Sequence, residues 1–145
     1  MAILIRPASH KDCETCAQLS RIEELATPDG DHLRVEFFSA NVDEDEMFIV
    51  AEENEQVMGY VLGQPMKGGY AYLSLLAVDA RMRGRGLGKT LVDAFLRRCI
   101  EKKLFFVTLF APSFNERTLK FYRTIGFEQG REHLEFGIHL DDISP

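Results

Sequence analysis

The 145-residue sequence contains no tryptophan, only three cysteines and no apolar stretch of transmembrane length. Three cysteines cannot build the paired framework of a small disulfide-stapled domain, so the chain suits a reducing compartment. Without a long apolar run it has no candidate membrane span. The stretch Met1–Arg6 is too short for the apolar region of a signal peptide. We therefore expect a cytoplasmic protein with no membrane partner.

The chain also lacks an excess of positive charge, since 17 Lys and Arg face 23 Asp and Glu, for a net charge of −6. A general nucleic-acid binder is normally basic, so we expect no nucleic-acid partner. The hydrophobic fraction of 46% and the charged fraction of 28% are ordinary for a globular protein. No linker or repeat interrupts the sequence, and its length suits a single core. This predicts one domain over residues 1–145.

The sequence also lacks Cys and His residues at the spacing of a metal site. Cys13 and Cys16 form a CxxC, but no second CxxC or His pair accompanies it, and it falls in an expected helix. The sequence therefore predicts no metal site and leaves a role for this cysteine pair open. Cys99 lies on the apolar seam of another expected helix and is interpreted as a core residue.

Hydrophobic periodicity and turn residues predict the secondary structure. Helices are expected from Ser9 to about Ala26, in a short segment capped by Asp31, after the glycine-rich turn, and from Asn115 to Thr124. Strands are expected over residues 2–6, 47–53, 56–64, 70–78, 104–110, 127–128 and 134–140. This order predicts a mixed, mostly antiparallel sheet of about six or seven strands flanked by about four helices, in the α/β (α+β) class.

The most informative stretch is a strand, a glycine-rich turn and a helix. The strand Leu73–Val78 leads into a turn dense in arginine and glycine, and the helix that follows has an apolar seam at helical spacing. Glycine lets a backbone approach an anion closely, and the first turn of a helix offers unpaired N–H groups and a positive dipole end. Arg83, Arg85 and Lys89 add cations at the same place. The pattern predicts a polyanion site.

Spacing separates the families that use such a turn. Gly88-Lys89-Thr90 imitates the end of a P-loop, but that motif would need glycine where Arg83 stands. A dinucleotide fingerprint that begins at Gly84 would need its third glycine at Lys89. The pattern that fits is [QR]xxGx[GA], read from Arg83 to Gly88. It resembles the acetyl-CoA pyrophosphate loop of the GNAT family of N-acetyltransferases. A nucleotide-phosphate site and a plain arginine-rich surface turn remain the alternatives at this point.

A second motif lies further along the chain. The segment Asn115–Phe127 resembles the C-terminal GNAT motif NxxAxxxYxxxGF, and it departs from it only by Thr118 in place of alanine. The two motifs occur in the family's order, with room for one helix and one strand between them. Together with the strand order, the resemblance covers Met47 to Leu140, and the chain is identified as a member of the family on these residues.

The resemblance implies a GNAT-like single-domain fold and an acyltransferase that moves an acetyl group from acetyl-CoA directly to a primary amine in a ternary complex. Tyr122 would protonate the leaving thiolate, and the Val78 N–H would stabilise the oxyanion. Asn115 would contact the cofactor arm. The resemblance assigns the remaining cofactor contacts to backbone groups at Leu76, Ala77 and Val78 for the pantetheine arm, and to Arg83, Gly84, Arg85, Gly86, Leu87, Gly88 and Lys89 for the pyrophosphate. On periodicity alone Tyr122 would be a core aromatic.

The general base and the acceptor stay open. Some family members carry a glutamate on the strand before the loop, but this chain offers only Ser74 there. The other candidates are Glu36, Glu46, Glu52, His32 and a water chain, and each charged group is more often simply solvated. A non-catalytic acyl-CoA-binding module is therefore kept as an alternative. Phe37, Phe38 and Tyr70 are candidates for an acceptor pocket or a homodimer contact, although core packing is the favoured interpretation.

Overall fold

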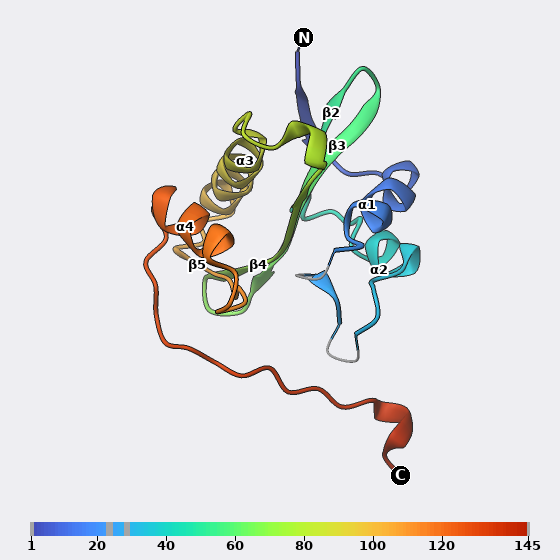
Figure 1. Ribbon diagram of the computed structural model, residues 1–145, viewed down its shortest axis with the longest axis vertical. Helices are drawn as coiled ribbons and strands as arrows, with labels where there is room; N and C mark the ends of the chain where they lie inside the picture. Colours follow the sequence, from blue (N-terminus) through green and yellow to red (C-terminus); the bar gives the residue numbers. More distant parts are fainter. Residues whose placement is uncertain (1, 23–24, 28–29, 145) are drawn as a thin grey trace.

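The computed structural model describes residues 2–22, 25–27 and 30–144 of the chain. Among these residues one five-stranded sheet runs in the order β1-β2-β3-β4-β5 (Figure 1). Strands β1 to β4 pair antiparallel, and β5 lies parallel to β4 at the edge. The bounds are β1 Leu4–Pro7, β2 Phe48–Glu53, β3 Gln56–Met66, β4 Tyr70–Val78 and β5 Phe106–Thr108.

Helices cover both faces of this sheet (Figure 1). One face carries α1, Cys13–Leu19, and α2, Val35–Ala40. The other carries α3, Leu87–Glu101, and α4, Glu116–Thr124. Short 3-10 turns occur at His10–Asp12, Ala80–Met82 and Leu140–Asp142. The mixed sheet between two helical layers confirms the predicted α+β class, with five strands among the described residues rather than six or seven.

The two cores follow from the alternation of side chains along β2 and β3. Phe48 and Val50 face α1 and α2 and pack with Phe38, while Ile49 and Ala51 face α3. Successive side chains of a strand point to opposite faces, so a continuous apolar run serves both layers. Fully burying each large apolar side chain stabilises the fold by about 1.5–3 kcal/mol.

The backbone explains one predicted turn of the sheet and one bulge that was not predicted. Asn54 and Glu55 join β2 to β3, and both have positive φ, as a tight two-residue hairpin requires. Gly63 lies at a bulge in β3, and a Cβ there would be 2.4 Å from the Tyr72 carbonyl oxygen and 2.5 Å from the Phe95 ring. The absence of a side chain therefore lets α3 pack directly on β3.

Several predicted bounds are wrong. The first helix ends at Leu19 instead of Ala26, where the Ser20 hydroxyl donates to the Cys16 carbonyl and bonds the Tyr60 hydroxyl. Ser20 thus satisfies the last turn and ties it to β3. Parts of the expected helix and of the turn after it, residues 23–24 and 28–29, lie outside the described residues. The second helix begins after Arg34 and not at an Asp31 cap.

The strand predictions at the C-terminal end are also corrected. The strand expected over residues 104–110 is only Phe106–Thr108. The closing strands expected over residues 127–128 and 134–140 do not form, and these residues lie in no strand. A strand pattern cannot be realised without a neighbouring strand to hydrogen-bond with, and the chain carries this segment away from its own sheet (Figure 1).

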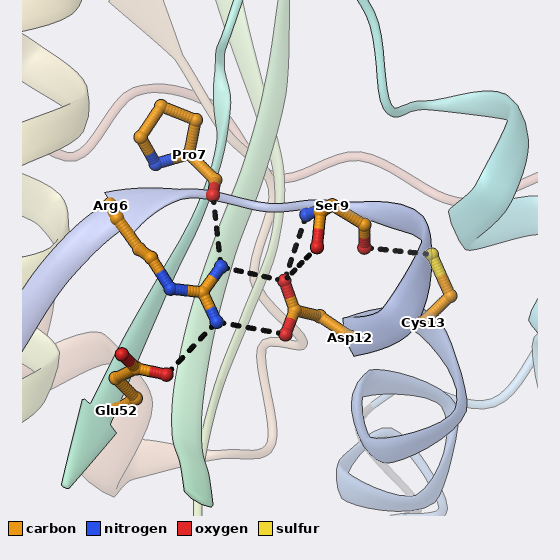
Figure 2. A network of polar contacts seen from close by, with 6 residues as sticks. All are labelled: Arg6, Pro7, Ser9, Asp12, Cys13 and Glu52. Atoms are coloured by element: carbon orange, nitrogen blue, oxygen red, sulfur yellow. Dashed lines mark hydrogen bonds and ion pairs between the residues drawn. The ribbon is translucent and has the colours of Figure 1, made fainter. Parts of the chain in front are cut away.

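A buried polar network joins β1, the first turn and β2 (Figure 2). The Arg6 guanidinium donates to both Asp12 carboxylate oxygens, at 2.8 and 3.0 Å, and to Glu52 at 3.0 Å. The Ser9 backbone N–H and hydroxyl donate to Asp12 as well, at 2.8 and 3.1 Å. Burial alone would raise the pKa of the Asp12 carboxyl, but these hydrogen bonds outweigh it and hold that pKa below its usual range. The network fixes where α1 starts on the sheet.

We expect Arg6→Met to destabilise the protein by about 3 kcal/mol, because it leaves the Asp12 carboxylate, which is only 4% exposed, without its cation. In the wild-type protein this group's stabilisation is present above a pH of about 4 and is lost as the pH falls through the lowered pKa of Asp12. In the Arg6→Met variant, burial raises the pKa of Asp12 instead. Lowering the pH should therefore restore part of the variant's free energy of unfolding. Urea unfolding at two pH values measures both effects.

Arg81→Met is the matched control, since Arg81 makes a comparable ion pair with Asp79 but its side chain is 70% exposed. Its cost should be small, because an exposed ion pair is screened by solvent. Equal losses of stability in the two variants would show that the Arg6 network contributes no more than an exposed ion pair.

Candidate active site

The site begins where β4 and β5 part. The two strands pair only at Tyr70 with Phe106, Ala71 with Val107 and Tyr72 with Thr108. From Leu73 to Val78, β4 has no strand beside it on this side in the described part of the chain. We call this stretch the open edge of β4. Its backbone groups lie where a hydrogen-bonding ligand could align with them.

The register shows which residues use the open edge. The Asp79 N–H donates to the Met58 carbonyl at 2.8 Å, and Val78 lies opposite Gly59 in the same register. Hydrogen-bonded and non-hydrogen-bonded pairs alternate along an antiparallel ladder, so the N–H and C=O of Val78 and Leu76 point away from β3. Ala77 points its groups toward β3. Of the three predicted backbone contacts, two therefore face the open edge and one faces the sheet.

The glycine-rich loop follows directly after β4. The Asp79 carboxylate accepts from the Arg81 N–H at 2.9 Å and holds the first turn of the loop. Gly84 and Gly86 both have φ of +77°, which a side chain would strain, and Gly86 is the N-cap of α3. The first intrahelical bond runs from the Thr90 N–H to the Gly86 carbonyl at 3.0 Å. The N–H groups of the three residues Leu87, Gly88 and Lys89 therefore have no partner within the helix and are available to an anion.

Two of the cations around this loop form ion pairs with acidic side chains of β2 and α3. Arg85 pairs with Glu53 at 3.3 Å, and Lys89 pairs with Asp93 at 2.8 Å. Both basic side chains are more than half exposed. Exposed ion pairs contribute at most about 1 kcal/mol, so an arriving phosphate can replace them. Arg83 makes no ion pair within the described residues.

Three elements converge at the first turn of α3. A Cβ at Gly88 would lie 3.2 Å from the Phe121 ring and 3.9 Å from the Val78 side chain. The glycine thus brings the start of α3, the end of β4 and the middle of α4 into contact. The sequence motifs predicted Gly88 and Val78 as site residues, but they did not single out Phe121. Its only signal was an aromatic side chain beside the motif tyrosine.

Tyr122 follows Phe121 on α4 and is packed between aromatic rings. Its ring lies 5.1 Å from Phe121 and 5.6 Å from Phe127, measured between centroids. Burial raises the pKa of the Tyr122 hydroxyl to about 12. The phenol is therefore neutral at physiological pH and holds a proton that it can donate.

Asn115 begins α4. Its side-chain oxygen accepts from the Thr118 N–H at 3.2 Å, as an N-cap does. This bond is compatible with Thr118 in place of the family's alanine, because the position contributes only its backbone N–H. Asn115 also serves to orient the helix that carries Tyr122.

The candidates for a general base are placed differently. The Ser74 hydroxyl donates a hydrogen bond to the Leu62 carbonyl at 3.0 Å, and Glu52 forms an ion pair with Arg6. Glu46 lies 3.9 Å from Arg98. His32 lines a hollow of about 380 Å³ together with Asp31 and Glu36, on the α1 and α2 side. Within the described residues the His32 Nδ1 atom is buried and has no hydrogen-bond partner.

Other features of the chain were tested against the structure. Cys13 and Cys16 are buried, and burial raises the pKa of both thiols, which disfavours the thiolate needed for metal binding or redox chemistry. Cys99 is buried in the core under α3, as predicted. Over the described ranges, no three His, Cys, Asp or Glu side chains gather as a metal site would require. In the same ranges no helix has the length and apolar character to cross a membrane.

Comparisons with known proteins agree with this geometry. The model of the acetyltransferase (GNAT) family matches residues 14–127. A histone acetyltransferase of Glycine max, TAP1, is 36% identical over 58 residues, which are 40% of this chain and 24% of the relative. The chain thus aligns with about a quarter of the length of that curated relative. A match over so few residues does not show that this chain shares the substrate of TAP1.

Solved structures resemble the whole fold. Ard1 from Thermoplasma volcanium superposes with a TM-score of 0.79 at 28% identity, covering 90% of this chain and 86% of Ard1. The ribosomal-protein-S18-alanine N-acetyltransferase from Escherichia coli superposes with a TM-score of 0.74 at 17% identity, covering 90% and 80%. At that identity the second likeness concerns the fold alone.

We expect Asn115→Ala to destabilise the protein by about 1 kcal/mol, because α4 loses its N-cap. Asn115→Asp keeps the accepting oxygen and should cost little. Thr118→Ala is the control, since only the backbone N–H of Thr118 takes part in the cap. Thermal unfolding of the three variants measures this, and an Asn115→Ala variant as stable as Thr118→Ala would contradict the capping role.

Proposed function

The chain belongs to the GNAT family of acetyltransferases, and from this premise we propose that it transfers an acetyl group from acetyl-CoA to a primary amine by direct transfer in a ternary complex. The acceptor is a small-molecule amine or a peptide or protein amine. The observation that carries the proposal is the open edge of β4, which ends beside both the glycine-rich loop and the helix of Tyr122.

The cofactor would occupy the loop and the open edge together. Its pyrophosphate would accept from the free N–H groups at the start of α3, with Arg83, Arg85 and Lys89 around it. Its pantetheine arm carries amide groups and would pair with the backbone of Leu76 and Val78 as an added strand does. Ala77 would supply apolar contact rather than hydrogen bonds. The arm would thus direct the thioester to the end of β4.

The chemistry needs an oxyanion donor and an acid. The amine nitrogen attacks the thioester carbonyl carbon, a C–N bond forms, and the carbonyl oxygen becomes an oxyanion that accepts from the Val78 N–H. When the C–S bond breaks, the thiolate takes the proton of the Tyr122 hydroxyl. The proton that the amine loses returns to solvent through a base or a water chain. Tyr122 then regains its proton from water.

The acceptor would approach from the α1 and α2 side of the sheet. That side holds the hollow lined by His32, by the acidic Asp31 and Glu36 and by the basic Arg21 and Arg34. A polar acceptor would meet charges of both signs there. Among the residues that the structure describes, the Nδ1 atom of His32 is buried without a hydrogen-bond partner, which makes this residue the base candidate with an available proton acceptor.

The alternative is an acyl-CoA-binding module without transfer activity. The residue at the strand position where some family members carry a base favours this alternative. That residue is Ser74, which has no carboxylate and whose hydroxyl donates to the Leu62 carbonyl. Release of free thiol from acetyl-CoA in the presence of an amine panel separates the two functions. Binding without any amine-dependent release would support the module.

The first functional prediction concerns the loop. Gly86→Glu and Gly86→Gln impose the same size and the same strain at φ +77°, and they differ only in charge. We expect the glutamate variant to bind acetyl-CoA about tenfold more weakly, or worse, than the glutamine variant, since about 1.4 kcal/mol of repulsion corresponds to tenfold. Thermal shifts and calorimetry with acetyl-CoA, with ATP–Mg as comparison, measure this. Equal affinities of the two variants for acetyl-CoA would show that the pyrophosphate does not bind at this loop.

The second functional prediction concerns the acid. Tyr122→Phe removes one oxygen and should lower kcat on the order of 100-fold while the Kd for acetyl-CoA is unchanged. Because the pKa of Tyr122 is raised to about 12, the wild-type rate should show no loss from phenol ionisation up to a pH of about 10. Steady-state kinetics across this pH range test both statements. A variant with normal turnover would show that another group protonates the thiolate.

A further inference from the structure

The hollow between the end of α1 and the start of α2 is built from two short stretches of the chain. Its lining residues are Ala17 and Arg21 of the first stretch and residues 31–36 of the second. The second stretch is held at its start, because the Thr27 N–H and hydroxyl both donate to the Asp31 carbonyl, at 2.7 and 3.1 Å. The hollow has a volume of about 380 Å³. Small-molecule sites measure about 300–1,000 Å³, so the hollow suits a small ligand.

The hollow is connected with the open edge of β4 through the apolar core. Ala17 and Leu33, which line the hollow, belong to the same apolar cluster as Leu75 and Ala77 of β4. Along β4 these two residues alternate with the residues whose backbone groups face the open edge. A ligand in the hollow would therefore lie on the α1 and α2 side of the strand segment that would bind the cofactor arm.

Charged side chains of both signs lie around this hollow. Arg21, Arg34 and Glu36 are exposed, and none of the three forms an ion pair within the described residues. Side chains of opposite charge that share one space without pairing can each bind the opposite charge of a ligand. The lining thus favours a ligand that carries a positive and a negative group rather than one charge alone.

His32 adds a polar atom that lacks a partner in the described part of the chain. Its Nδ1 atom is buried and accepts or donates no hydrogen bond there, whereas its backbone N–H donates to the Asp31 carboxylate at 2.8 Å. Buried polar atoms of proteins are nearly always hydrogen-bonded, so an unpaired one beside a hollow points to a ligand. In the tautomer with its proton on Nε2, the Nδ1 atom accepts a hydrogen bond, which an ammonium group can donate.

We propose that the acceptor is a small molecule that carries a carboxylate besides its primary amine, such as a free amino acid, and that it binds in this hollow. The inference rests on the proposed acetyl transfer and specifies its substrate class. The acceptor carboxylate takes hydrogen bonds from the guanidinium groups of Arg21 and Arg34, and the ammonium group donates to Glu36 and to the His32 Nδ1 atom. A peptide amine has an amide in place of the carboxylate and would leave both arginines without a partner.

The first test compares acceptors that differ only in the carboxylate. Thiol release from acetyl-CoA is measured with a panel of amino acids and with the corresponding amino acid amides. We expect kcat/KM to be about tenfold higher, or more, for the acid of the best pair, since hydrogen bonds between charged groups are stronger than neutral ones. Equal or faster transfer to the amides, or to peptide amines, would overturn the proposal and leave the proposed acetyl transfer intact.

Calorimetry separates a failure of this inference from a failure of the proposed function. The same acids and amides are titrated into the chain loaded with CoA, which binds acceptors without turnover. Preferential binding of the acids without any thiol release from acetyl-CoA would support the hollow as their site and contradict acetyl transfer. If none of the acids binds and none is acetylated, the proposal is wrong.

The second test removes the two cations of the hollow. The double variant Arg21→Met with Arg34→Met should raise KM for the amino acid about tenfold or more, while kcat, the KM for the amide and the Kd for acetyl-CoA stay unchanged. Arg97→Met with Arg131→Met is the control, because it removes the same charge from exposed residues that do not line the hollow. An equal KM for the amino acid in the two double variants would overturn the proposal.

The third test concerns the ammonium end of the acceptor. Glu36→Gln removes the charge at nearly constant size, and it should raise KM for the amino acid and for its amide by the same factor, because both carry the ammonium group. The arginine variants should change the preference between the two acceptors, and this variant should not. A Glu36→Gln protein with the KM of the wild type for both acceptors would contradict the proposed orientation. Circular dichroism of each variant confirms that the domain is folded.

Discussion

The backbone groups of Leu76 and Val78 have to find hydrogen-bond partners outside the sheet, and the architecture around the site is arranged by this requirement. A central antiparallel strand normally has its N–H and C=O groups paired on both sides. Here β5 pairs with only the first residues of β4, so the rest of β4 keeps one side open. A ligand that carries amides along an extended arm matches that side in spacing and in polarity. The loop and α3 begin at the end of the same strand, which places the free N–H groups of the first turn of α3 close to the end of the open edge.

Tight packing at two glycines keeps this arrangement rigid. Gly63 lets α3 lie against β3, and Gly88 lets Phe121 of α4 reach the first turn of α3 and Val78. A side chain at either position would push a helix outward, because interiors are packed too closely to absorb another methyl group. The helix that carries Tyr122 is therefore positioned by the same contact that places the loop. The burial that raises the pKa of Tyr122 is a consequence of this packing and also the reason that its proton is retained.

Much of this could be predicted from the sequence, because the relevant signals are local. The bounds of β4, the hairpin at Asn54, and the glycines that need positive φ all follow from residue type and spacing. What could not be predicted depends on contacts between distant residues. The end of α1 is set by the hydrogen bond between the hydroxyls of Ser20 and Tyr60, which lie far apart in the sequence. The contribution of Asp12 to stability depends on its hydrogen bonds with Arg6. In the same way, the sequence left His32 as one of several base candidates, and only the structure shows that its Nδ1 atom is buried without a hydrogen-bond partner among the described residues.

The open edge of β4 and the outer side of β5 both lack a neighbouring strand among the described residues, but their surroundings differ. The open edge of β4 ends at the glycine-rich loop and its cations, which suits a ligand with polar and anionic groups. Beside β5 lie exposed aromatic side chains instead. The alternation in residues 134–140 predicts a strand, but the structure places these residues in no strand. A strand needs a neighbour, so sequence periodicity can show that a segment is able to pair and cannot show whether an edge is available to it.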